Sequence, residues 1–590
     1  MDEYNDLSLF RLVLYDDVIA AGHKVLGTVW AYSIKFDKEG KFLKLNPRWC
    51  VMGGSMDRGV YDSFSDVMLR VTLWILGVLR AIYPVIDFQM DFGNAFQDTP
   101  ATPEAAANFG HTVDQRTEKL PVVYYQQARG FVKYGPNGER YVCEGQMAHQ
   151  GRIDSAALFR RASRTLFKEM GCRTAVRDPQ LYVFHHGPTA QEAHELPDIL
   201  AKCAGMPATT GAPPGWAAFG MHVDDGAGIA SSVQVRDYIE GRVAVLYACK
   251  MTNWQTILGY TVDIDDLEHT VTFSAYPMVK QLAEEHLVER AIIQPKMPYM
   301  GSIMSVVGGE RPAQGAPDLA EYLIMESKTR SILGSGIWLS DVYPQIMWCN
   351  NHLCAFSAKA GPDVYRHATY WLMHLLAFPV PVIFVGINAY RKSLVLSDTP
   401  IPPFSPFEKE LGYHQICDAN LGSTGDFKAI TGVVDMLGGS AIGCHAGRQQ
   451  LTAPDSTTAE MVAAGTGHSR VISKRGLLQE LSIPQIMATP QYIDASSVVF
   501  QAHDATAVKR AVWLRRRAAV LQEGNEDGTT NSTKIDEWNN PADAFTKVLT
   551  SEVFHRHMHY THNKKGEPPA LKKQLQAPSV VTAVPSTKGF

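Results

Sequence analysis

The sequence of 590 residues lacks the features that mark secreted and membrane proteins. Its 9 cysteines are odd in number and scattered, and no C-x-x-C pair occurs, so neither a zinc ribbon nor a disulfide framework is indicated. The most apolar run, residues 71–79, is far shorter than the roughly 20 residues of a membrane span. The N-terminal residues are acidic and show no basic-then-apolar leader. We therefore expect a soluble intracellular protein; the sequence does not distinguish cytoplasm from nucleus.

An excess of basic charge is also missing. Lys and Arg number 55 against 60 Asp and Glu, which gives a net charge of −5. A net acidic chain does not attract polyanions through its overall field, so a nucleic-acid site would have to be a local basic channel. With 45% hydrophobic and 19% charged residues, the composition is that of a globular protein. At about 100–200 residues per domain, we expect several domains.

Strand-like and helical patterns alternate along the chain, which is typical of a mixed α/β protein. Strands are expected at 24–36, 85–90, 412–419 and 433–437, and helices at 63–81, within 321–377 and from 457. Segments 99–118 and 185–215 are rich in Pro, Ala, Gly and Thr and are expected to be surface insertions. We interpret the proline-dense segment 400–406 as a linker and the Lys/Pro-rich residues after Asn563 as a disordered tail.

Acidic residues that follow apolar strands are the first candidates for chemistry. Asp91 follows the strand expected at 85–90, and Asp224 and Asp225 form the turn of an expected hairpin. Phosphoryl transfer on nucleic acids uses two divalent ions held about 3.5–4 Å apart by carboxylates. A rigid sheet fixes such carboxylates best at strand ends, so these three residues are candidate metal ligands.

Taken alone, an Asp-Asp pair is more simply interpreted as an exposed turn. Two other pairs are weaker candidates still. The pair at 16–17 has no earlier strand to supply a partner carboxylate, and the pair at 265–266 lies in a charged turn typical of a solvated hairpin loop.

Short motifs occur along the chain in a fixed order. The first series is VLGTVW with Lys35 and Gly40, RWCV with Gly54, QMDFGNAF, YQQARGF, DPQLY, HVDD, ILGY and MP, which begin at residues 25, 48, 89, 125, 178, 222, 257 and 297. The second series is YHQICDA, TG, LGG, DSTTAE, QYIDAS and PADAFTK, which begin at residues 413, 431, 437, 455, 491 and 541. Together they resemble the reverse transcriptase and RNase H regions of the Pol polyprotein of copia-type LTR retrotransposons. Each match is short, but they are collinear over most of residues 24–554.

This resemblance implies a mixed α/β fold of known parts. It implies a right-hand polymerase with fingers and palm, then a connection segment, then an RNase H-like mixed five-stranded sheet with helices. The domain boundaries expected from the motifs are 1–23 for an N-terminal segment, 24–300 for fingers and palm, 301–406 for a helical thumb or connection with the linker, 407–562 for the RNase H-like domain, and 563–590 for the tail.

The resemblance also implies an activity and its ligands. The expected enzyme is an RNA-directed DNA polymerase, a nucleotidyltransferase, with RNase H activity on RNA–DNA hybrids. Its partners would be an RNA template, a DNA primer, the hybrid and dNTPs. Each active site would use two Mg²⁺ ions, with Mn²⁺ possible. The implied catalytic and metal-binding residues are Asp91, Asp224 and Asp225 in the polymerase, and Asp418, Glu460, Asp494 and Asp543 in the RNase H region.

Three further residues match positions that bind the incoming nucleotide. Lys35 and Arg48 would grip the triphosphate, Arg48 by bidentate contacts, and Phe96 would block a ribose 2′-OH. Simpler interpretations exist for each: an exposed hairpin charge for Lys35 and Arg48, and a core aromatic for Phe96. For Glu460 and Asp543 the simpler interpretations are an exposed helix-face acid and a helix N-cap.

The sequence departs from the family at several positions. His222 replaces the usual Tyr, Asp154 stands where a dNTP-contacting Gln belongs and adds negative charge, and Asn420-Leu421 replace Asp-Trp. Two alternatives therefore stay open: a catalytically decayed nucleic-acid-binding remnant, and an RNase H-type nuclease with an inactive polymerase half.

Two remaining clusters have no assigned role. Lys509, Arg510 and Arg515 to Arg517 flank Trp513 and could follow a hybrid backbone, although a solvated charged face explains them equally well. The histidines at 555, 557, 559 and 562 lack a nearby Cys or acid that would complete a metal site.

Overall fold

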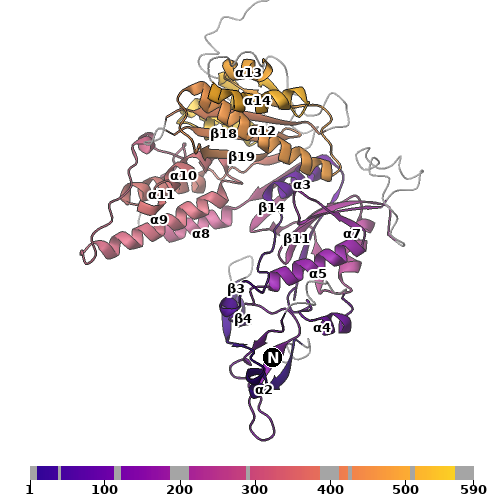
Figure 1. Cartoon of the computed structure of the whole chain (residues 1–590). Helices are drawn as coiled ribbons and strands as arrows, with labels where there is room; N and C mark the ends of the chain where they lie inside the picture. The colour runs from indigo at the N-terminus through magenta and orange to yellow at the C-terminus, as the bar shows by residue number, and fades with distance from the viewer. Residues whose placement is uncertain are drawn as a thin grey trace, which may run out of the picture. The chain divides into compact units, whose positions relative to one another are not determined.

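The structure is a computed structural model that describes residues 9–36, 42–111, 121–186, 212–287, 293–385, 411–422, 428–504 and 512–564 (Figure 1). The chain divides into two compact units. The first comprises Met1–Leu76, Pro84–Leu258 and Glu480–Ser482, and the second comprises Gly77–Tyr83, Gly259–Gln479 and Ile483–Phe590. The mixed α/β class expected from the sequence is confirmed.

A six-stranded antiparallel sheet forms the centre of the first unit, with the strand order β12-β5-β11-β10-β9-β8. The strands are β5 (Ile86–Phe92), β8 (Cys172–Thr174), β9 (Leu181–His186), β10 (Gly215–His222), β11 (Asp225–Ala230) and β12 (Cys249–Thr252). The expected strand at 85–90 and the hairpin that carries Asp224 are thus confirmed.

Two helices cover one face of this sheet. Side chains of α5 (Ser155–Glu169) and α7 (Val233–Val243) pack on alternate residues of β5 such as Phe88, Met90 and Phe92. Because strand side chains alternate between faces, the acidic residues of β5 at 87 and 91 belong to the opposite face. The core therefore anchors β5, and on the opposite face Asp87 is buried while Asp91, near the strand end, is exposed.

Smaller sheets complete the first unit. A four-stranded sheet has the order β1-β7-β6-β2, and β3 pairs with β4 in a separate two-stranded hairpin. The strands are β1 (Phe10–Leu14), β2 (Val25–Leu26), β3 (Thr28–Phe36), β4 (Phe42–Val51), β6 (Tyr124–Tyr125) and β7 (Tyr141–Gly145); short helices are α2 (Tyr15–Ala20) and α4 (Pro103–Asn108). Ala105 and Ala106 of α4 are buried, so this part of segment 99–118 is packed against the protein.

The helix expected at 63–81 begins later than predicted. The structure has α3 at Arg70–Ile82, and residues 63–69 are not helical. Asp178, distant in sequence, accepts hydrogen bonds from the backbone N–H of Leu69 (2.9 Å) and from the Thr72 hydroxyl (2.5 Å). The Asp178 carboxylate, from another segment, therefore satisfies hydrogen-bond donors at the N-terminal end of α3. The local sequence pattern contains no indication of this contact.

The second unit begins with a helical region, as the helical pattern within 321–377 predicted. Its helices are α8 (Tyr276–His286), α9 (Leu319–Leu339), α10 (Met347–Cys354) and α11 (Pro362–Ala377). The strands β14 (Tyr260–Asp265), β15 (Thr270–Ser274) and β16 (Ile383–Val385) are neighbours, in this order, in one small sheet. The exposed pair Asp265 and Asp266 lies where β14 turns into β15, as expected of a hairpin loop.

A mixed five-stranded sheet forms the rest of the second unit, with the order β19-β18-β17-β20-β21. Its strands are β17 (Tyr413–Asn420), β18 (Ile430–Leu437), β19 (Ser440–Arg448), β20 (Thr489–Ile493) and β21 (Thr530–Lys534). The β19-β18-β17 part is antiparallel, and β17-β20-β21 is parallel. The expected mixed five-stranded sheet is thus confirmed.

Three helices lie against this sheet on one face (Figure 1). They are α12 (Ser456–Glu480), α13 (Ser496–His503) and α14 (Val512–Glu526), and α15 (Ser551–Thr561) follows at the C-terminal side. Met461, Val498 and Leu521 from the three helices join Cys417 and Val433 of the sheet in one core cluster. This core fixes the ends of β17 and β20, where acidic residues follow.

Several sequence-based expectations lie outside the described residues. These are the turn at 37–40, the linker at 400–406, most of segment 185–215, Lys509 and Arg510, and the tail beyond residue 564. Among the helices that the structure describes, none combines the length and apolarity that a bilayer crossing requires.

Candidate metal centres

The first candidate centre lies in the six-stranded sheet, where two carboxylates occupy neighbouring strands and a third lies in the adjoining turn. Asp91 is directly opposite Asp225 in the register of β5 and β11. Asp224 is in the two-residue turn between β10 and β11, in which His222 pairs with Asp225. Side chains directly opposite in an antiparallel pair have Cβ atoms about 4.5–5.5 Å apart. The sheet therefore brings the three predicted residues to one end.

The hairpin turn holds an unusual backbone conformation. Val223, at the first turn position, has φ 60°, which a β-branched residue adopts only at an energetic cost. Two-residue hairpin loops require positive φ at this position, which Gly usually supplies. The surrounding sheet enforces this geometry, and it sets the position of Asp224 beside Asp225.

The electrostatics of this centre match a cluster of like charges. Burial raises the pKa of Asp225, and the negative charges of Asp224 and Asp91 raise it further, while His222 lowers it. Repulsion of this kind is relieved when a cation binds. Lys250 of β12 lies directly opposite Asp91 on its other side, a neighbour that the sequence analysis missed because the pairing of β12 with β5 is not local.

The predicted nucleotide-binding residues have mixed positions. Arg48 is exposed on β4. The backbone of Lys35 on β3 pairs with that of Lys44 on β4, while the Lys35 side chain lies outside the described part. Phe96 is half-buried and packs edge-on against Phe159, with ring centroids 6.5 Å apart. Its contacts are those of a core aromatic. Within the described part of the chain, neither Arg48 nor Phe96 forms a hydrogen bond or ion pair with the carboxylates of this centre.

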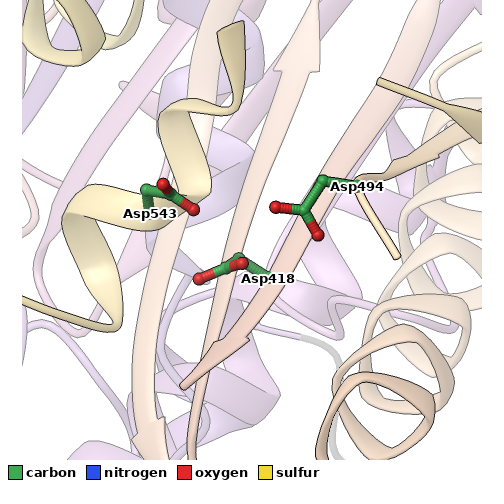
Figure 2. Close-up of side chains that lie close together, drawn as sticks. All are labelled: Asp418, Asp494 and Asp543. Carbon is green, nitrogen blue, oxygen red and sulfur yellow. The ribbon is translucent and has the colours of Figure 1, made fainter. Parts of the chain in front are cut away.

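The second candidate centre is a cluster of three aspartates in the five-stranded sheet (Figure 2). Asp418 lies on β17, Asp494 follows directly after β20, and Asp543 lies on a short 3-10 helix, Pro541–Phe545. One carboxylate oxygen from each residue lies within 4.8 Å of the others. Among the described residues, no other group of three or more His, Cys, Asp or Glu side chains meets this criterion.

The sheet register explains why these residues meet. β17 and β20 are parallel, and Cys417 is opposite Ile493, so Asp418 and Asp494 follow at the same edge. Figure 2 shows the three side chains turned toward one another from a strand, a strand end and a helical turn. Residues far apart in sequence thus form one site because of the pairing of two parallel strands.

Glu460, the fourth predicted residue, lies near the triad but is not within its 4.8 Å group. Burial raises the pKa of Glu460, and Asp418 and Asp494 raise it further. Its Oε2 atom is buried without a hydrogen-bond partner, as is Oδ1 of Asp418. Unpaired buried carboxylate oxygens are costly unless a proton or a cation satisfies them.

The other groups around the triad are donors. The Nζ atom of Lys547 lies 2.9 Å from Oδ1 of Asp543 and 3.8 Å from Oδ2 of Asp418. The Thr546 hydroxyl donates to Asp418, and the Asn540 side-chain amide donates to Asp494 over 3.1 Å. The sequence motif contained Lys547, but only the structure shows that this cation contacts two of the acids.

Burial is the main cause of the electrostatic state of the triad. It raises the pKa of Asp418 and of Asp543; Lys547 opposes the shift at both, while Asp494 raises the pKa of Asp418 and Asp418 raises that of Asp543. Because every ligand atom is a carboxylate oxygen, the set suits hard divalent cations such as Mg²⁺ or Mn²⁺. The orphaned oxygens of Asp418 and Glu460 fit such an ion.

One position that the sequence analysis treated as a departure has a structural explanation. Asp154 is fully buried and forms a bidentate pair with Arg152, with Nη2–Oδ2 and Nε–Oδ1 distances of 2.8 and 3.0 Å. Its charge is therefore neutralised within the protein. The expected repulsion of a triphosphate by Asp154 is not supported by this geometry.

Asp435 is a buried acid that the sequence analysis missed. It accepts hydrogen bonds from Tyr413 and Gln415, and ion pairs with Arg470 and Lys474 at 2.8 and 2.9 Å. Burial would raise its pKa, but the two cations hold that pKa well below its usual range. Because Arg470 and Lys474 lie on α12, this network fixes the helix that carries Glu460 to the sheet. The sequence contained one indication of this network: Asp435 stands within the otherwise apolar strand predicted at 433–437.

Comparisons with known proteins give weak structural similarities. No family model and no curated protein matches the chain. The structure of a foamy viral protease-reverse transcriptase dRH in complex with double-stranded DNA is 10% identical, with a TM-score of 0.42, covering 88% of this chain and 68% of that one. A foamy viral protease-reverse transcriptase in complex with an RNA/DNA hybrid is 10% identical, with a TM-score of 0.35, covering 88% of this chain and 52% of that one. Similarities of this size do not decide the function of the present chain.

Proposed function

We propose that this protein is an RNA-directed DNA polymerase with RNase H activity, of the copia-type retrotransposon class that its motifs resemble. The observation that carries the proposal is the convergence of Asp418, Asp494 and Asp543 within 4.8 Å, with Glu460 beside them. A cluster of buried acids repels itself without a cation, so a fold gains little from assembling one for stability alone. The position of Asp418 on β17 and of Asp494 directly after its parallel neighbour β20 supports the proposal.

In this proposal each unit contributes one site. Asp418, Glu460, Asp494 and Asp543 hold the metals of the RNase H site. Asp91, Asp224 and Asp225 hold those of the polymerase site. Divalent ions bound in such pairs activate the attacking oxygen and stabilise the leaving group. The substrates are a DNA primer, an RNA template, dNTPs and the resulting hybrid.

The remaining residues and boundaries belong to the same proposal. Lys35 and Arg48 bind the triphosphate, and Phe96 restricts the ribose. The domain assignment is 24–300 for fingers and palm, 301–406 for the thumb or connection and 407–562 for the RNase H part.

A nuclease without polymerase activity is the second candidate. It is favoured by one observation: among the described residues the aspartate triad meets the 4.8 Å criterion, whereas Asp91, Asp224 and Asp225 do not. A binding remnant without turnover is the third outcome of the test below.

Two assays on the full chain separate these candidates. The first is extension of a DNA primer on an RNA template, and the second is cleavage of labelled RNA in a hybrid, each with Mg²⁺, with Mn²⁺ and with a chelator. We expect metal-dependent activity in both, with Asp225→Asn abolishing extension only and Asp418→Asn abolishing cleavage only. Cleavage without extension supports the nuclease. Hybrid binding with neither activity supports the remnant, and neither binding nor activity contradicts the proposal.

A further inference from the structure

A cavity of about 200 Å³ lies in the helical part of the second unit, formed by residues around α11, α15 and the segment at 344–346. Its walls are mainly apolar and include Phe378, Val380, Phe554 and Met558. Phe554 and Met558 are each 2% exposed and form fixed walls of the protein interior. None of these residues takes part in either metal centre.

The polar lining of this cavity is basic. It comprises Lys296, His374, His555, His562 and Lys564, together with Gln345, and among the described residues that line the cavity none is acidic. The two lysines are exposed, whereas His374 and His562 are buried. Burial lowers the pKa of His374, His555 and His562. Neighbouring lysine and histidine side chains, such as Lys564, lower these pKa values further. The positive charge of this lining therefore comes from the two lysines, and no acidic residue of the described lining pairs with it.

His562 has an unpartnered polar atom at this cavity. The side-chain amide nitrogen of Gln345 donates to the carbonyls of Phe378 and Val380, so its Oε1 atom accepts from Nε2 of His562 over 2.9 Å. Nδ1 of His562 is then buried without a hydrogen-bond partner, in a residue that is 2% exposed. A buried polar atom of this kind lacks a partner, which a polar group bound in the cavity would supply.

We propose that this cavity binds a small aromatic or branched aliphatic carboxylate. The apolar walls would enclose its hydrocarbon part, and Lys296 and Lys564 would pair with its charge. The carboxyl group satisfies Nδ1 of His562 whichever of the two carries the shared proton, since one donor and one acceptor are always present. An apolar cavity of about 150 Å³ admits benzene, so about 200 Å³ leaves room for a ring with one acid substituent. This binding does not depend on the proposed polymerase or nuclease activity.

Benzoate is the test probe, titrated calorimetrically into the full chain. Benzyl alcohol, which has the same ring without the charge, and inorganic phosphate, which has charge without the ring, are titrated in parallel. We expect benzoate to bind, and both comparison compounds to bind at least about tenfold more weakly, the factor for one charge-assisted hydrogen bond. Equal binding of phosphate means a site for anions alone, and equal binding of benzyl alcohol means an apolar void; either result overturns the proposal.

Variants locate the binding. Val380→Phe fills the cavity and should abolish benzoate binding, with Phe378→Trp as a second filling variant at a more exposed position. Lys296→Gln with Lys564→Gln should weaken it about tenfold. The matched control, Lys280→Gln with Lys328→Gln, changes two exposed lysines of the same unit that do not line the cavity and should leave it unchanged. Benzoate binding that persists in folded filling variants, or that is absent in the parent chain, contradicts the proposal.

Discussion

The carboxylate of Asp154 is fully buried, and Arg152 beside it is 2% exposed, so neither charge has access to solvent. Removing one partner of a buried pair leaves the other charge unpaired, which costs about 3–5 kcal/mol. We therefore expect Asp154→Ala to lower the free energy of unfolding by about that amount. The measurement is denaturant unfolding of the full chain, monitored by a signal from the first unit.

Two control variants separate the unpaired charge from other effects. Asp237→Ala breaks an exposed pair with Arg236 and should change stability by at most about 0.5 kcal/mol. The double variant Arg152→Met with Asp154→Ala removes both charges and should recover much of the loss. If Asp154→Ala is as mild as Asp237→Ala, the pair does not form in solution.

Lys547 is the cation that lies against the aspartate triad, 2.9 Å from Asp543. Because its ammonium group and a bound metal ion compete for the same oxygens, Lys547→Met should bind Mg²⁺ more tightly than the parent chain. In the absence of metal the variant should be less stable, since the carboxylates lose their counter-ion. Calorimetric titration of Mg²⁺ and thermal unfolding with a chelator measure the two effects.

The comparison variant for Lys547 is Lys534→Met. The ammonium group of Lys534 donates to the main-chain carbonyl of Asp494 and not to a triad carboxylate. It should leave Mg²⁺ affinity close to that of the parent chain. Weaker Mg²⁺ binding in Lys547→Met would mean that Lys547 supports the metals instead of competing with them.

At the scale of single elements, the β10–β11 hairpin carries the clearest local strain. Val223 has φ 60°, a conformation that costs an L-residue about 1–2 kcal/mol and that Gly adopts freely. Val223→Gly should therefore raise the free energy of unfolding by about 1 kcal/mol, after the entropic cost of Gly. Denaturant unfolding checks this. The control is Val233→Gly, at the first turn of α7, which should destabilise the protein by up to about 1 kcal/mol. If the turn variant Val223→Gly loses stability instead, the turn differs from the one described.

Because of the carboxylates near the ends of β17 and β20, the stability of the five-stranded sheet region should depend on both pH and Mg²⁺. The pKa values of Asp418, Glu460 and Asp543 are raised in the folded chain, mainly by burial. A raised carboxyl pKa stabilises the fold below the ordinary value near 4, and that contribution is lost as pH rises through the folded pKa. Metal binds the deprotonated carboxylates. The increase in Tm that Mg²⁺ produces should therefore be larger at about pH 9 than at about pH 6.

Thermal scans across this pH range, with Mg²⁺ and with a chelator, measure the effect. Asp418→Asn should remove most of the Mg²⁺-dependent increase in Tm. Asp318→Asn, an exposed acid at the start of α9 without a capping hydrogen bond, should retain it. An increase that is the same at both pH values, or unchanged in Asp418→Asn, would show that Mg²⁺ acts elsewhere.

How far the sequence predicts these elements depends on whether the signal is local. Asp418 lies in the strand that the sequence predicted at 412–419, so its place on a strand could be predicted locally, whereas Asp494 was expected only through the motif that contains it. The start of α3 could not, because the residue that satisfies its N-terminal end, Asp178, is remote in sequence. The cation at the triad and the network around Asp435 also depend on tertiary pairing, which periodicity does not report.

At the scale of the whole molecule, each of the two units contains one carboxylate centre. The motif order along the chain predicted both centres, but the structure gathers them to different degrees: the C-terminal aspartates meet within 4.8 Å, and the N-terminal ones are set side by side by strand register. The proposal of two phosphoryl-transfer sites therefore depends most on the C-terminal centre. It is the centre at which an experiment is most decisive.

Anomalous diffraction from crystals of the full chain grown with Mn²⁺ and an RNA–DNA hybrid tests this centre most directly. We expect two Mn²⁺ peaks about 3.5–4 Å apart. Asp418, Glu460, Asp494 and Asp543 should be the protein ligands, and the Lys547 ammonium should be displaced from the carboxylates. An ordered triad without bound Mn²⁺ at saturating concentration, with Lys547 still paired to Asp543, would contradict the account.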